Sequence, residues 1–104
     1  MLTESYFDYS NQDEMTTLFI RVHPRMVSYA RNMLYNISYI SAEDLINEVF
    51  YKFMKRKTTI SKDKVDGYIF VMLRNECFDL LKQAKIENNV NIEDMAALQK
   101  IDNI

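Results

Sequence analysis

The stretch SAEDLINEVFYKFMKR, residues 41–56, decides the fold of this chain. Its apolar residues stand three and four positions apart, which is the spacing of one face of an α-helix. This face is expected to be buried and holds Leu45, Ile46, Val49, Phe50, Phe53 and Met54. Ser41 and Asp44 form an S-x-x-D pattern, which predicts that the helix begins just after Ser41. The other side is acidic at its start and basic at its end, so it is either a solvated face or a surface for a partner.

The composition favours one helical domain in a chain of 104 residues. A single glycine and a single proline are too few for an all-β sandwich or barrel, which needs frequent turns. Cys77 is the only cysteine, which excludes an intramolecular disulfide framework and suits a reducing compartment. No apolar run is long enough to span a membrane, and the start MLTESYFDYS lacks the basic region of a signal peptide. We therefore expect a cytoplasmic protein with no membrane partner.

Helical spacing also appears on both sides of the opening stretch. Residues 12–36 predict a first helix, but Pro24 is expected to break it, because proline lacks the amide donor and clashes with the preceding turn. A basic loop, KRKTTISKDK, precedes a last helix expected over about 64–86. The predicted fold is all-α, a compact bundle of three to four helices. The expected division is a flexible N-terminus at 1–11, a helical domain at 12–86 and an acidic linker or C-terminal arm at 87–104.

Charge is unevenly distributed along the chain. Residues 1–51 carry three bases and seven acids, residues 52–85 nine bases and four acids, and residues 86–104 one base and four acids. A basic middle between acidic ends suggests two kinds of partner surface on one domain. Chance clustering explains the charges alone about equally well.

The last helix has two contrasting faces. One stripe is apolar and is expected to be core: Ile69, Phe70, Leu73, Cys77, Leu80, Leu81 and Ala84. Cys77 belongs to this stripe, which favours a buried apolar residue over a nucleophile. The opposite side holds Val71, Arg74, Asn75, Phe78, Lys82 and Lys85. Cations interleaved with an aromatic ring suit single-stranded nucleic acid, where stacking contributes about 1–3 kcal/mol per base. The competing interpretation is that Phe78 packs against the rest of the domain.

Three segments in order resemble region 2 of the sigma-70 family, and most closely its extracytoplasmic-function (ECF) group. They are RVHPRMVSYARNML, SAEDLINEVFYKF and YIFVMLRNECFDLLKQAK, and the resemblance covers about residues 12–86. It implies a transcription initiation factor domain that binds RNA polymerase core and recognises and melts the promoter −10 element. An anti-sigma factor is a further partner that the resemblance implies.

The resemblance gives the polar side of the 41–56 helix a partner, the clamp helices of the polymerase β′ subunit. It implies that the docking residues are Glu43, Asp44, Asn47, Glu48 and Tyr51. Carboxylates there can pair with arginines of a coiled coil and set the orientation of docking. Against this stands a solvated helix with a Glu48–Lys52 pair, which contributes only about 0.3–0.5 kcal/mol. Asn47 departs from the glutamine usual in the family.

The resemblance also gives the basic middle a partner, the non-template strand of the −10 element. Asn75 would hold a flipped base, with Met72 and Leu73 near its pocket, although Leu73 also falls on the core stripe. Unstacking that base costs a few kcal/mol, which pocket and cations must offset. Together with Phe78 from the opposite face of the last helix, the residues expected to contact DNA are Lys55, Arg56, Lys57, Met72, Arg74, Asn75, Phe78, Lys82 and Lys85.

The C-terminal part departs from the family pattern. It turns acidic where a denser basic cluster is usual, and it resembles the linker that threads towards the polymerase active-site channel. Region 4, which reads the −35 element, is absent from the sequence, as in a single domain or a shortened factor.

Two alternatives to a promoter-melting factor stay open. One is a helical protein-interaction module that never touches DNA, and the other is a sigma-like regulator that binds polymerase without melting promoters. An enzyme is not expected, because His23 and Cys77 are the only histidine and cysteine and no glycine-rich phosphate loop exists. No metal site, catalytic residue or cofactor is predicted.

Overall fold

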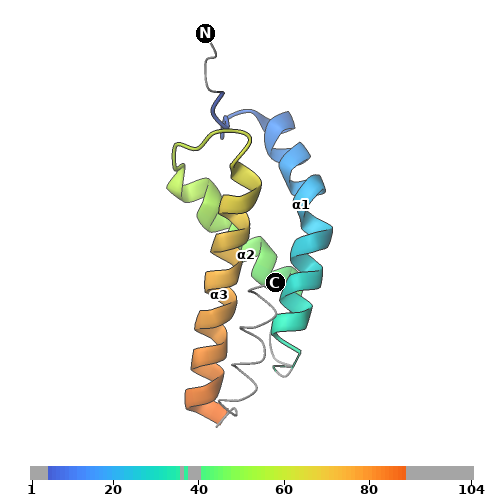
Figure 1. Ribbon diagram of the computed structural model, residues 1–104, viewed down its shortest axis with the longest axis vertical. Helices are drawn as coiled ribbons and strands as arrows, with labels where there is room; N and C mark the ends of the chain where they lie inside the picture. Colours follow the sequence, from blue (N-terminus) through green and yellow to red (C-terminus); the bar gives the residue numbers. More distant parts are fainter. Residues whose placement is uncertain (1–4, 36, 38–40, 89–104) are drawn as a thin grey trace.

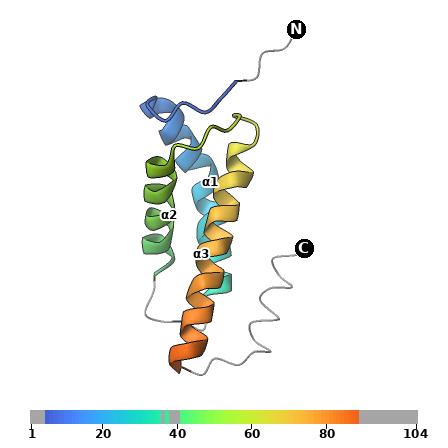
Figure 2. The ribbon, with the colours of Figure 1, turned by 90° about the vertical axis from the view of Figure 1, so that its left-hand side faces the viewer.

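Three α-helices make up most of the computed structural model, which describes residues 5–35, 37 and 41–88, with side chains up to residue 84. They are α1 (Gln12–Met33), α2 (Ala42–Arg56) and α3 (Val65–Asn88). Each helix packs on the other two. Helices α1 and α3 run in the same direction, and α2 runs back in the opposite one (Figures 1 and 2). The described part of the chain is therefore an all-α bundle of three helices, at the lower end of the predicted number.

The predicted break at Pro24 does not interrupt the first helix. Helix α1 continues through Pro24 for two further turns and more, to Met33. Both halves bury apolar side chains on the same face, Leu18 and Val22 before the proline and Met26 and Ala30 after it. Burial of both halves in one core offsets the hydrogen bond that Pro24 cannot donate.

Local side-chain bonds explain where the helices begin. Asn11 caps α1, because its Oδ1 accepts from the Glu14 amide at 3.1 Å. Ser41 caps α2 as predicted, with its Oγ accepting from the Asp44 amide at 3.0 Å. Each cap satisfies one of the amides that a helix start leaves without a partner.

One hydrophobic core runs between the three helices. Helix α2 contributes Leu45, Ile46, Val49, Phe50 and Phe53, as predicted. Met54, expected to be buried with them, is 42% exposed. On α3 the predicted core stripe is buried except for Phe70 and Leu80, which are partly buried and pack against the core.

The chain before α1 takes part in the core. We call residues 5–11 the N-terminal strap and residues 57–64, between α2 and α3, the basic loop. Phe7 is 6% exposed and belongs to the core cluster, and Tyr6 forms an isolated antiparallel bridge with Ser61. The sequence does not predict this packing of residues 5–11, because they show no helical spacing of apolar residues. The division into a flexible 1–11, a domain at 12–86 and an arm at 87–104 stays a prediction, and residues 89–104 lie outside the described part.

None of the helices within the described ranges is long and apolar enough to cross a membrane.

Candidate functional site

The residues predicted to dock on a protein form one exposed stripe along α2. We call this set the outer stripe: Glu43, Asp44, Asn47, Glu48 and Tyr51, all exposed. Their spacing of three and four residues places them on one face, opposite the buried Ile46, Val49 and Phe53. The Tyr51 side chain is 53% exposed. The stripe is a polar surface with an exposed aromatic ring at its C-terminal end.

The carboxylates of the outer stripe differ in their partners. Glu43 Oε2 lies 3.0 Å from His23 Nε2 of α1, and the His23 ring packs at 4.8 Å on Phe19. Within the described part of the chain, the side chains of Asp44 and Glu48 make no hydrogen bond or ion pair. Two of the three carboxylates therefore have no bonding partner among the residues that the structure describes.

Lys52 does not pair with Glu48 along the helix. Its ammonium donates instead to Glu76 of α3. The bond to Glu76 raises the pKa of Lys52 above its ordinary 10.5, with a smaller contribution from the charge of Glu48. Lys52 thus serves to hold α2 against α3, which the sequence did not predict because Glu76 lies 24 residues further along the chain.

A cluster of cations ends α2 and opens the basic loop. Lys55, Arg56 and Lys57 are all exposed, and the Lys55 Nζ lies 5.3 Å from the centre of the Tyr51 ring. Lys57 adopts a left-handed conformation, φ 48°, and its amide donates to the Phe53 carbonyl at 3.3 Å. We call these three residues the α2 basic end.

The predicted nucleic-acid stripe of α3 is only partly exposed. Asn75 and Lys82 are exposed. Arg74 and Phe78 are half-buried, with the guanidinium carbon of Arg74 6.0 Å from the centre of the Phe78 ring. Phe78 also packs against the core, as the competing interpretation expected. The side chain of Lys85 lies outside the described part.

Met72 is not on this surface. It is 7% exposed and belongs to the core cluster with Leu73, which is fully buried. The expectation that Met72 lies beside a base pocket does not fit its burial in this structure. Its neighbour Val71, 44% exposed, occupies the outward position instead.

An apolar groove between α1 and α2 was not anticipated. It encloses about 310 Å³ and is lined by Met15, Thr16, Phe19, Asn47, Phe50 and Met54. Asn47 belongs to both the groove and the outer stripe, so the two adjoin. The exposed Met54 is explained by this groove, because α1 approaches α2 there without covering the last turn.

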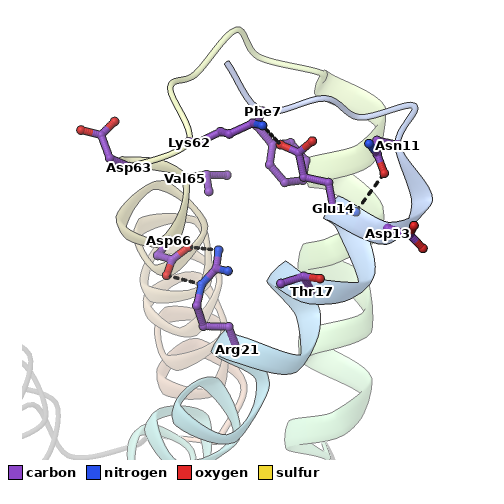
Figure 3. Close-up of a pocket in the computed structure, with 10 residues that line it drawn as sticks. All are labelled: Phe7, Asn11, Asp13, Glu14, Thr17, Arg21, Lys62, Asp63, Val65 and Asp66. Carbon is purple, nitrogen blue, oxygen red and sulfur yellow. Dashed lines mark hydrogen bonds and ion pairs between the residues drawn. The ribbon is translucent and has the colours of Figure 1, made fainter. Parts of the chain in front are cut away.

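A second hollow, of about 470 Å³, lies between the strap, the start of α1 and the start of α3 (Figure 3). Four of its charged groups form two pairs: Arg21 makes two bonds to Asp66, of 2.7 and 2.8 Å, and Lys62 lies 3.4 Å from Glu14. The bonds from Arg21 hold the pKa of Asp66 below its usual 3.8. These contacts join α1 to α3 and to the basic loop, which indicates a structural role for the hollow.

Neither a metal centre nor a nucleophile emerges from the described residues. No three of their histidine, cysteine, aspartate or glutamate side chains are placed to hold a metal ion. Cys77 is fully buried in the core, where a thiol is inert.

Residues 18–86 match the model of the family described as Sigma-70 region 2. No curated protein matches the chain, and no solved structure matches it. The matched residues include α2, the basic loop and most of α1 and α3.

Proposed function

Because this chain belongs to the sigma-70 region 2 family, we propose that it docks on the β′ clamp helices of RNA polymerase through the outer stripe and binds and melts promoter −10 DNA with its basic residues. Family membership gives it a role in RNA polymerase binding and promoter recognition, as a transcription factor domain and not as an enzyme. The A-E-D pattern of residues 42–44 favours the ECF group within the family, and with it an anti-sigma factor as a regulator.

One observation carries the docking part of the proposal, namely the availability of Asp44 and Glu48. Lys52, one turn after Glu48, is bonded to Glu76 instead, so Glu48 makes no ion pair with it along the helix. A charged hydrogen bond to a partner arginine contributes about 1.5–3 kcal/mol, several times the value of a pair on a solvated helix. A basic coiled coil that covers the outer stripe would therefore stabilise its carboxylates more than solvent or a helix pair does.

The α2 basic end and the exposed part of α3 support the DNA part. The exposed cations here are Lys55, Arg56, Lys57 and Lys82. Exposed cations contribute to nucleic-acid binding by releasing counterions from phosphates. Asn75 presents an exposed amide, which can read a base edge. The half-buried Phe78 offers only part of its ring for stacking.

The docking face is tested with a double charge reversal, Asp44→Lys with Glu48→Lys. We expect this variant to bind an isolated β′ clamp-helix fragment about tenfold or more weakly than the wild type, since two charge-assisted bonds become repulsions. Isothermal titration calorimetry of the full chain against the fragment measures the difference.

A matched control is Asp13→Lys with Asp79→Lys, which makes the same change in net charge. Asp13 is exposed in the first turn of α1, as Asp44 is in that of α2, and Asp79 is exposed within α3. The control is expected to bind like the wild type. Equal weakening in both variants would mean that only net charge matters, and the docking face would then be lost as an explanation.

The burial of Met72 favours a second candidate, a sigma-like regulator that binds polymerase without melting promoters. The variant Lys82→Ala with Lys85→Ala separates the two. A promoter-binding factor loses affinity for DNA, with a shallower dependence on salt, when assayed in complex with core polymerase. A regulator or an interaction module shows no change.

A further inference from the structure

The N-terminal strap and the basic loop are joined by main-chain hydrogen bonds. The Phe7 amide donates to the Ile60 carbonyl at 2.8 Å, and the Lys62 amide donates to the Ser5 carbonyl at 2.9 Å. These bonds surround the Tyr6–Ser61 bridge. The strap thus pairs with the middle of the loop as a short antiparallel ribbon.

The strap is itself anchored in the core. The Phe7 ring lies 5.5 Å from that of Phe53 and 5.0 Å from that of Tyr9, and Tyr9 lies 5.0 Å from Phe53. Since Phe53 is fully buried on α2, the strap joins the loop to a rigid part of the domain.

Tyr9 bonds directly to the start of the basic loop. Its hydroxyl donates to the Thr58 carbonyl at 2.6 Å, over a sequence distance of 49 residues. Partial burial raises the pKa of Tyr9 above its ordinary 10.0, so the phenol keeps its proton and donates. Thr58 is next to Lys57, and its Oγ1 lies 3.0 Å from the Tyr68 hydroxyl of α3. The chain just after the α2 basic end is therefore held from two sides.

We propose that the strap positions the basic loop for nucleic acid, and that Tyr9 is a positioning residue whose hydroxyl fixes the backbone beside Lys57. This inference rests on the DNA-binding part of the proposed function. The strap itself need not touch the nucleic acid. By restricting the loop before binding, the strap reduces the conformational entropy that the loop loses when its cations bind phosphates.

The hydroxyl is tested by Tyr9→Phe, which keeps the aromatic contacts and the fold. We expect faster amide hydrogen exchange in residues 57–64, with no change in the middle of α1. We also expect the chain, in complex with core polymerase, to bind a short A+T-rich single-stranded DNA about three- to tenfold more weakly, the range set by one lost hydrogen bond. The salt dependence should stay that of the wild type, because no phosphate contact is removed.

Ser41→Ala is a matched control, because it also removes one hydrogen bond but at the start of α2. It should leave both the exchange of the loop and the affinity for DNA unchanged. A Tyr9→Phe variant that binds DNA as well as the wild type overturns the inference, whatever its loop exchange. If the wild type itself does not bind the oligonucleotide, the DNA-binding function fails. In that case, unchanged amide hydrogen exchange of residues 57–64 in Tyr9→Phe would also overturn the claim that the strap restrains the loop. Faster exchange would support that claim.

Discussion

Lys57 combines a strained backbone conformation with a positive charge at the end of α2. It ends α2 with φ 48°, a conformation that costs a residue with a side chain roughly 1 kcal/mol and that glycine adopts freely. Glycine is the usual residue at this position of a helix end. A lysine at this position lowers the stability of the fold and places a positive charge at the first residue of the basic loop.

Lys57→Gly is expected to raise the free energy of unfolding by about 0.5–1 kcal/mol, because the backbone strain disappears. The same change is expected to weaken binding to single-stranded DNA, because one cation is lost. Urea denaturation measures the first effect and fluorescence anisotropy the second. Lys57→Ala is the control, since it removes the charge and keeps the strain. It should weaken DNA binding without the gain in stability, and a gain equal to that of glycine would contradict this account.

Two methionines show the limit of what the sequence predicts for single residues. Helical spacing predicts that Met54 is buried, and the family resemblance implies that Met72 lies near a base pocket, yet Met54 is 42% exposed and Met72 only 7% exposed. Each lies at the boundary between faces, where the position of a neighbouring helix decides burial. Helical spacing gives the direction of a side chain but not how far the neighbouring helix extends over it.

Helix α1 is the element in which a strong local preference is overridden. Pro24 sits inside it and is exposed. Its ring cannot donate to the carbonyl of Ile20, and a proline within a helix costs about 3 kcal/mol relative to alanine. The apolar residues on both sides of it, Val22 and Met26, are fully buried and keep the helix on the core.

Pro24→Ala is expected to increase the free energy of unfolding by about 1–3 kcal/mol, because it restores a donor and removes the clash. Thermal or urea denaturation followed by circular dichroism measures the change. Ser28→Ala, at an exposed position one turn further on, should raise stability by no more than about 0.5 kcal/mol. A Pro24→Ala variant no more stable than Ser28→Ala would indicate that the helix already accommodates the proline without cost.

At the scale of the whole molecule, the domain separates an acidic surface from a basic one. The acidic outer stripe begins at the first turn of α2, and the α2 basic end lies at its last turn, so one helix carries both charges in the order that its dipole favours. In the proposed function, the acidic end of α2 faces a basic protein surface and its basic end faces nucleic acid.

Cys77 offers a probe of the whole bundle. It is fully exposed to thiol reagents only when α3 leaves the core, since its side chain is 0% exposed in the folded domain. We expect a disulfide reagent to label it slowly in buffer and rapidly in urea, at a rate that follows the fraction unfolded. Ser28→Cys in a Cys77→Ala chain provides the reference for an exposed thiol. Labelling of native Cys77 at that reference rate would contradict the packing of α3.

The sequence by itself determined the three helices, the cap at Ser41, most of the core and the family. The helices, the cap and the core faces depend on residues a few positions apart, because helical hydrogen bonds and helical spacing are local. The family follows from three motifs in order along residues 18–86. Only the tertiary structure decided that Lys52 bonds to Glu76, that the strap pairs with the basic loop and that an apolar groove adjoins Asn47. These contacts join residues tens of positions apart, and their geometry follows from how three helices pack, which no local pattern encodes.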